Sequence, residues 1–132
     1  MKAVGYTKPL PVAAPGALVD LTMETPTPGP RDLRVAVRAV SVNPVDTKVR
    51  LRVHPAAGEP AKVLGYDAAG VVEAVGAAVD EVRVGDRVAY AGGGPAYAEA
   101  ANVAAARLVP LPDWVSDQEA AAALLKGLTV QY

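Results

Sequence analysis

The stretch SVNPVDTKVR, residues 41–50, gathers polar side chains at one corner of a chain that is otherwise rich in alanine and valine. It offers the amide of Asn43, the carboxylate of Asp46 and the cations of Lys48 and Arg50. Each has an ordinary structural role as well. Asn43 can cap a turn before the following proline, Asp46 can accept the hydrogen bonds that hold the corner, and the two cations are solvated by default. The density of polar groups makes this corner the first candidate for an active site.

Few other side chains in the sequence could do chemistry, because it contains no cysteine and a single histidine. Without cysteine there is no thiolate nucleophile, no thiolate metal ligand and no disulfide. The histidine, His54, stands beside a proline in a polar segment. We therefore expect it to be a solvated loop residue rather than a metal ligand or a catalytic base.

Length and charge are those of a small soluble domain. The 132 residues fit one domain, and 13 Lys and Arg against 14 Asp and Glu leave a net charge of −1. The charges are scattered, without the basic runs typical of nucleic-acid binding. Prolines interrupt the N-terminal segment, so it does not read as a signal peptide, and no apolar run reaches about 18 residues, the length of a membrane span. We expect a cytoplasmic protein that acts on a small molecule or a protein partner.

Short strands must position the polar corner. The clearest strand is 32–42, where apolar side chains alternate with Arg34 and Arg38. Pro44 ends it, and residues 45–53 are predicted to form one or two helical turns. Further strands are predicted at 1–6, 17–23, 63–76 (one bent strand or two), 84–90, 96–103 and 107–111. Seven or eight strands of this length predict a mainly β fold, a small barrel or sandwich.

Glycines divide the second half of the predicted strands. Gly65, Gly70 and Gly76 stand in a strand context and are predicted to mark bends and close backbone approach. The run at 92–94 lacks the G-x-G-x-x-G spacing and the strand-to-helix context of a phosphate-binding loop. We predict an ordinary flexible loop there.

A helix is predicted near the end of the chain. Ser116 followed by Glu119 forms a capping box, and the stretch from Ala120 to Leu125 contains no polar residue. A helix that is apolar on nearly every side is a buried one, which in so short a chain requires another domain or another subunit. We expect the helix to leave an apolar patch that drives self-association of the isolated chain.

Five segments in order resemble the medium-chain dehydrogenase/reductase superfamily: NPVD, GYDAAGVVEAVG, VGDRV, YAEAANV and, near the end, LLKGLTVQY. The chain resembles the N-terminal, GroES-like catalytic domain of the quinone oxidoreductase and zinc-type alcohol dehydrogenase-like branch. The resemblance implies a partly open, GroES-like β-barrel with short helices over residues 1–124. It implies that residues 125–132 begin the junction to a Rossmann domain, which would follow in such a protein.

The resemblance also indicates whether the chain would bind a catalytic metal. Zinc-dependent members carry a cysteine where this chain has Asn43, and a His-Glu pair where it has Tyr66 and Asp67. Catalytic zinc takes about three protein ligands from His, Cys and carboxylate groups, and these residues do not supply them. The resemblance therefore implies a zinc-independent member, with no metal ligands.

For the zinc-free branch, the resemblance implies hydride transfer from NADPH to a quinone or an enone. Negative charge then develops on the substrate oxygen and must meet a donor or a proton. The amide of Asn43 and the phenol of Tyr66 are the predicted catalytic groups. The predicted cofactor contacts are Asn43, Lys126 and Thr129, the predicted substrate-lining residues are Val45, Lys48 and Tyr66, and the predicted structural supports are Asp46 and Asp67.

Two other functions stay open. One is a non-enzymatic GroES-like binding module that pairs through its apolar C-terminal helix, which the absence of a cofactor domain favours. The other is a zinc-dependent alcohol dehydrogenase domain with unusual ligands, against which the lack of cysteine argues. Asn43 together with LKGLT favours the reductase, and such a catalytic portion is expected to be inactive or weak alone.

Overall fold

The computed structural model describes residues 1–92 and 94–131. The predicted loop at 92–94 and the predicted junction at 125–132 thus each include one residue, 93 and 132 respectively, outside the described part. The elements in chain order are β1 (Lys2–Tyr6), β2 (Val19–Thr22), β3 (Asp32–Val40), α1 (Pro44–Arg52), β4 (Lys62–Val63), β5 (Asp67–Val75), β6 (Arg87–Ala91), β7 (Ala100–Ala104), a 3₁₀ turn (Ala105–Arg107), β8 (Leu108–Pro110) and α2 (Asp117–Gln131).

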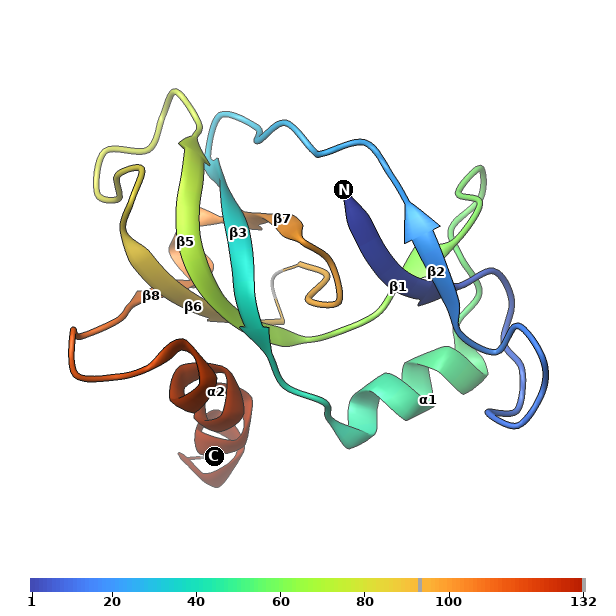
Figure 1. Cartoon of the computed structure of the whole chain (residues 1–132). Helices are drawn as coiled ribbons and strands as arrows, with labels where there is room; N and C mark the ends of the chain where they lie inside the picture. Colours follow the sequence, from blue (N-terminus) through green and yellow to red (C-terminus); the bar gives the residue numbers. More distant parts are fainter. Residues whose placement is uncertain (93, 132) are drawn as a thin grey trace.

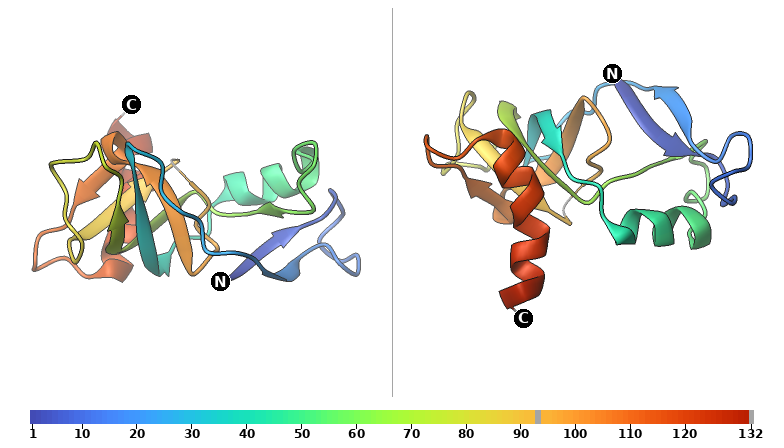
Figure 2. Two further views of the ribbon diagram at one scale, coloured as in Figure 1. Left: turned by 90° about the horizontal axis from the view of Figure 1, so that it is seen from above. Right: turned by 60° about the horizontal axis from the view of Figure 1, so that its bottom comes forward.

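The strands form two sheets that lie side by side (Figures 1 and 2). The larger sheet has the order β7-β3-β5-β6-β8, and the smaller one has the order β2-β1-β4. Helix α1 lies along the smaller sheet, and α2 packs against the larger one (Figure 1). The predicted mainly β fold is confirmed, and over residues 1–92 and 94–131 both sheets are open and do not close into a barrel.

The pairing of β3 with β5 brings the polar corner and the Tyr66-Asp67 segment together. At this pairing a Cβ on Gly70 would lie 2.0 Å from the carbonyl oxygen of Ala36, so only glycine allows the strands to approach this closely. The register continues to Val40 opposite Ala68. One step further, the Ser41 N–H donates to the Asp67 carbonyl at 3.3 Å.

Gly65 shapes the entry to β5. Its φ of +101° belongs to a region that other residues rarely adopt, and a Cβ there would lie 2.6 Å from the Ala96 side chain. The bend splits the predicted 63–76 segment into β4 and β5, so it is two strands. It also places Asp67 at the first position of β5.

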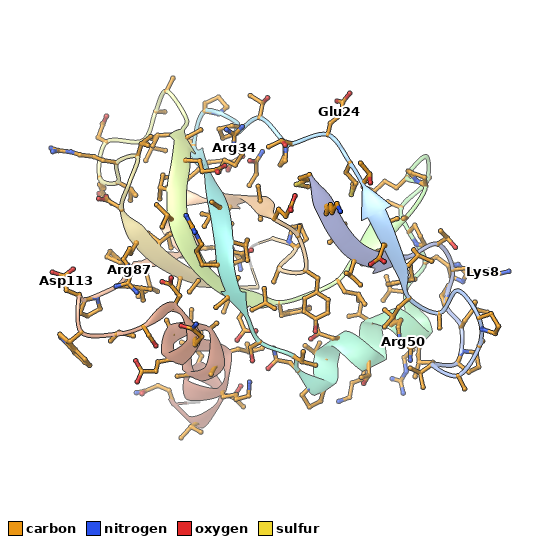
Figure 3. All side chains as sticks on the ribbon, in the orientation of Figure 1. Lys8, Glu24, Arg34, Arg50, Arg87 and Asp113 are labelled. Carbon is orange, nitrogen blue, oxygen red and sulfur yellow. The ribbon has the colours of Figure 1, made fainter. Side chains whose placement is uncertain are left out.

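Two residues of the N-terminal segment, Tyr6 and Leu10, hold helix α1 in place through hydrogen bonds. The buried Tyr6 hydroxyl lies 3.1 Å from the Val49 carbonyl oxygen and 2.7 Å from that of Val53, at the C-terminal end of α1. Arg50 was expected to be solvated, and this is wrong: it is 5% exposed and donates to the Leu10 carbonyl. The N-terminal segment passes beside this face of α1 and supplies the acceptor (Figure 3).

Helix α2 is anchored at its start and packed through small side chains. The predicted capping box is confirmed, since the Ser116 N–H donates to Glu119 Oε2 at 2.9 Å and the Glu119 N–H donates to Ser116 Oγ at 3.1 Å. Arg87 of β6 reaches Asp117 Oδ1 at 2.8 Å. Alanines then line the contact between sheet and helix: Ala69, Ala89, Ala120 and Ala121.

The expectation that α2 leaves apolar surface exposed in this chain is confirmed, and the chain itself buries only one side of the helix. Ala122 and Ala123 are exposed, and towards the end Leu128 is 43% and Val130 is 88% exposed. The reason is geometric, because a helix that packs against β3, β5 and β6 of one sheet has only one packed face, and α2 extends beyond the sheet (Figure 2). Across the described part of the chain, neither helix is long and apolar enough to cross a membrane.

Candidate functional site

Four residues from three distant parts of the chain meet at the predicted corner, and we call them the Asn43 cluster: Ser41, Asn43, Asp67 and Lys126. The Asn43 side chain lies at its centre and is 4% exposed. Its Nδ2 donates to Asp67 Oδ1 at 2.6 Å and to the Ser41 carbonyl oxygen at 3.3 Å. Lys126 Nζ donates to Asn43 Oδ1 at 2.9 Å and to Ser41 Oγ at 2.7 Å. The amide is thus held between an ammonium and a carboxylate.

Each member is positioned by a separate local feature. Asn43 is the N-cap of α1, with Pro44 at the first helical position, where its missing N–H costs nothing. Asp67 begins β5 after the Gly65 bend. Lys126 arrives from α2, whose alanine contacts let it lie close to the larger sheet.

The Asp67 carboxyl group is fully buried, which dominates its electrostatics. Burial raises its pKa above the ordinary value, whereas the hydrogen bond from Asn43 and the charge of Lys126 act in the opposite direction. Its Oδ2 has no hydrogen-bond partner among residues 1–92 and 94–131. The cluster therefore contains a buried carboxyl group that is only partly compensated.

Asp46 links the cluster to the loop before β7. Its Oδ2 accepts the Asn43 backbone N–H at 2.8 Å and the Tyr97 hydroxyl at 2.7 Å. Asp46 is thus the residue that caps the first turn of α1, while the Asn43 side chain turns away to Asp67. Burial and the neighbouring Asp46 raise the pKa of Tyr97 far above its usual range, so its hydroxyl stays a donor. Asp46 and Asp67 both accept hydrogen bonds here, as structural supports would.

A groove of about 640 Å³ adjoins the cluster through Asp46 and Tyr66, although none of the four cluster residues lines it. Most of its lining is apolar, and its polar members include Asp46 and Tyr66. Tyr66 is 36% exposed, and its hydroxyl makes no hydrogen bond to any residue that the structure describes. The lining residues are Met23, Asp46, Val49, Val53, Glu59, Pro60, Ala61, Lys62, Val63, Leu64, Gly65, Tyr66, Gly92, Gly94 and Pro95.

The other predicted site residues lie away from this groove. Val45 is half-buried and Lys48 is exposed on α1, and neither lines the groove. The Thr129 hydroxyl donates to the Leu125 carbonyl at 2.9 Å on the exposed end of α2. His54 is exposed in its loop. Within the described ranges, no three His, Cys, Asp or Glu side chains lie together as metal ligands would.

Sequence reasoning missed two residues of the site. Ser41 was assigned only to the strand, although its hydroxyl accepts from Lys126. Tyr97 entered only as part of the YAEAANV segment, and its contact with Asp46 spans 51 positions in the sequence. A lone tyrosine in a Gly- and Ala-rich loop was the available signal, because such a side chain there has few local partners.

Comparison with known proteins places this geometry in a family. Residues 29–113 match the alcohol dehydrogenase GroES-like domain. A quinone oxidoreductase of Pseudomonas aeruginosa is 51% identical over 106 residues, which cover 80% of this chain and 32% of the relative. A zinc-type alcohol dehydrogenase-like protein of Staphylococcus aureus is 37% identical over an alignment of 133 positions, which covers 98% of this chain and 38% of the relative.

The solved structures agree. Quinone oxidoreductase of Escherichia coli, solved in complex with NADPH, superposes with a TM-score of 0.89 at 33% identity. The superposition covers 100% of this chain and 40% of the E. coli chain. This chain therefore spans only about a third to two fifths of the length of these relatives. The family match covers more than half of this chain, and the predicted GroES-like fold is confirmed. The chain belongs to the alcohol dehydrogenase GroES-like domain family of the medium-chain dehydrogenase/reductase superfamily.

Proposed function

We propose that the chain forms the substrate-side wall of a zinc-independent, NADPH-dependent oxidoreductase that reduces quinones or enones in the cytoplasm. The Asn43 cluster carries the proposal, because it sets a buried amide between Lys126 and Asp67 beside a largely apolar groove. Relatives named quinone oxidoreductase support the reaction class. The E. coli structure in complex with NADPH supports the cofactor.

The residues present fit one side of a nicotinamide cofactor. Lys126 is exposed at the surface, yet hydrogen bonds to Ser41 and Asn43 fix its ammonium group. A charged hydrogen-bond donor therefore lies where α2 extends beyond the sheet. When bound, NADPH supplies the hydride. Lys126, Asn43 and Thr129 would contact the cofactor, and the phosphate-binding elements would belong to a dinucleotide-binding domain of such a protein.

The groove fits an uncharged, flat substrate. Aliphatic side chains of α1 and of the segment before β5 line it, including Val49, Val53 and Leu64. Tyr66 contributes a hydroxyl at the same wall. In this proposal the apolar lining excludes water from a quinone ring, and Tyr66 lies beside that ring.

The cluster does not fit zinc. The Asn43 amide directs its hydrogens, not lone pairs, towards Asp67, and its oxygen already accepts from the Lys126 ammonium. A divalent cation there would have to displace Lys126 and turn the amide over. The proposed reaction therefore involves no metal.

A fluorescence titration of NADPH into the chain, with quinone turnover assayed on the same sample, tests the proposal. Saturable binding with turnover supports a reductase that completes its site as an oligomer. Binding and turnover that appear only when a dinucleotide-binding domain of a quinone oxidoreductase is supplied support one wall of a two-domain enzyme. Neither activity in either form would reject the proposal.

A non-enzymatic binding module is the second candidate, and the exposed far end of α2 favours it. This module would show tight pairing with a protein through α2 and no NADPH-dependent turnover in any form. Stoichiometric zinc in the purified protein after dialysis would instead favour the alcohol dehydrogenase type.

A further inference from the structure

Both N–H hydrogens of the Asn43 amide already have acceptors. A side-chain amide has two N–H hydrogens. In this structure one donates to Asp67 Oδ1 at 2.6 Å and the other is directed to the Ser41 carbonyl oxygen at 3.3 Å. The side chain is also buried. Donation to a substrate oxygen would leave the buried Asp67 carboxyl group without its one side-chain donor, which is costly.

Lys126 differs from Asn43, because one N–H hydrogen of its ammonium group has no acceptor among the described residues. An ammonium has three N–H hydrogens. Two donate to Ser41 Oγ and to Asn43 Oδ1, at 2.7 Å and 2.9 Å. No further hydrogen bond joins the ammonium to residues of the described part, and Lys126 is exposed. The third hydrogen can therefore meet an oxygen that comes from outside the chain.

The two acceptors also hold the ammonium in place. A lysine at a surface normally samples many rotamers, and fixing it costs side-chain entropy. Here Ser41 and Asn43 fix the head group, and the Asn43 amide in turn is oriented by Asp67. The hydrogen bonds therefore run from the Asp67 carboxylate through the Asn43 amide to the Lys126 ammonium, which lies at the surface.

We infer that Lys126, rather than Asn43, is the donor to the substrate carbonyl oxygen, and that Ser41, Asn43 and Asp67 are positioning residues for it. This inference rests on the proposed function, and it moves the predicted catalytic role within the same site. A fixed ammonium stabilises negative charge that develops on that oxygen. The ligand class is a ring-borne carbonyl or oxyanion.

The test uses 4-nitrophenol as the probe in the 132-residue chain, without NADPH. The probe carries a ring oxyanion, and its absorbance reports whether it is ionised. An ammonium within hydrogen-bond distance lowers the pKa of a bound phenol by about 1 unit or more, so phenolate should bind about tenfold more tightly than phenol. We expect this preference in the native chain and in Lys126→Arg, and its loss in Lys126→Met.

Lys8→Met is the matched control, since Lys8 is an exposed lysine on the N-terminal loop, on the opposite side of the molecule from α2 (Figure 3). It should behave as the native chain does. A second readout tests positioning: the ¹⁵N-edited NMR signal of the Lys126 ammonium, sharp when its hydrogens exchange slowly, should broaden in Asn43→Ala. Amide spectra of each variant establish that it is folded.

Two results would overturn the inference. One is an unchanged phenolate preference in a folded Lys126→Met chain, and the other is no saturable binding of the probe to the native chain. Neither result depends on NADPH or turnover. A failure of the proposed reductase activity, with a Lys126-dependent phenolate preference intact, would therefore be recognised separately.

Discussion

Asn43 Nδ2 donates to Asp67 Oδ1 at 2.6 Å, and both side chains are buried. This bond joins the N-cap of α1 to the first residue of β5, two positions that are 24 residues apart. Because Lys126 of α2 donates to the other end of the same amide, three elements depend on one asparagine. The site is therefore part of the packing of the domain, and its charges must affect stability as well as chemistry.

The first prediction concerns the pH dependence of stability through Asp67. Burial raises its pKa in the folded chain, so the folded state binds this proton more tightly than the unfolded state does. The free energy of unfolding contributed by Asp67 must then decrease as pH rises from about 4, the ordinary value, to the raised pKa, and stay level above it. Asp67→Asn removes this titration and keeps an acceptor for Asn43.

Urea unfolding across this pH range measures the effect. The stability of the native chain minus that of Asp67→Asn should fall with rising pH through the window and then become constant. Contributions that are the same in both chains cancel in the difference. A difference that does not vary with pH, or that grows, would contradict the raised pKa.

The second prediction concerns Tyr97. Its hydroxyl is one of two donors to Asp46 Oδ2, and Asp46 Oδ1 is buried without a partner in the described structure. Tyr97→Phe should lower the free energy of unfolding by about 1–3 kcal/mol, because it removes a hydrogen bond to a buried carboxylate. Denaturant titration measures the loss. Tyr66→Phe is the control for stability, since that hydroxyl bonds no described residue, and equal losses in the two variants would refute the assignment.

Much of the fold could be predicted from sequence because local rules control it. Alternation in β3, the stop at Pro44 and the Ser116-Glu119 capping box each act over a few residues, and the structure reproduces them. The exposed apolar surface of α2 was predicted, but the face that packs against the larger sheet was not, because apolar composition shows only what could be buried. It does not show which neighbours a chain of this length provides.

The site was harder to predict from the sequence, because its hydrogen bonds join residues that are far apart in the chain. Asn43, Asp67 and Lys126 were singled out as polar side chains near the corner or in family segments, yet their mutual contacts follow only from the β3-β5 register and the packing of α2. Arg50 shows the same limit. Its burial depends on a carbonyl 40 residues earlier, which no local pattern reveals.

The third prediction tests the close approach of β3 and β5. Gly70→Ala would place a Cβ 2.0 Å from a backbone oxygen of Ala36, which cannot move without breaking the sheet. We expect a loss of about 3 kcal/mol or more in the free energy of unfolding, and with it loss of the Asn43-Asp67 contact. Thermal and urea unfolding measure it.

Gly127→Ala is the matched glycine control, because a Cβ there meets nothing within 4 Å on an exposed turn of α2. Replacing a helical glycine with alanine should stabilise the chain by about 0.5–1 kcal/mol. Equal and small effects at the two positions would mean that the strands can separate to accept a side chain at position 70.

The fourth prediction is self-association through the far end of α2. Leu128 is 43% and Val130 is 88% exposed, and Val42 at the corner is 73% exposed. Burying such side chains between copies stabilises association, by about 25 cal/mol for each Å² of apolar surface removed from water. Sedimentation of the isolated chain should therefore show a concentration-dependent increase in mass. Val130→Glu should shift this increase to about tenfold higher concentration or more, because a charge would be desolvated in the interface.

Val12→Glu is the control for that shift, because Val12 is similarly exposed, at 70%, on the N-terminal loop. The charge it adds changes net charge by the same amount, so it separates a local effect at α2 from general repulsion between chains. A strictly monomeric chain at high concentration would exclude the prediction. Equal shifts in the two variants would mean that the copies associate through a surface other than the end of α2.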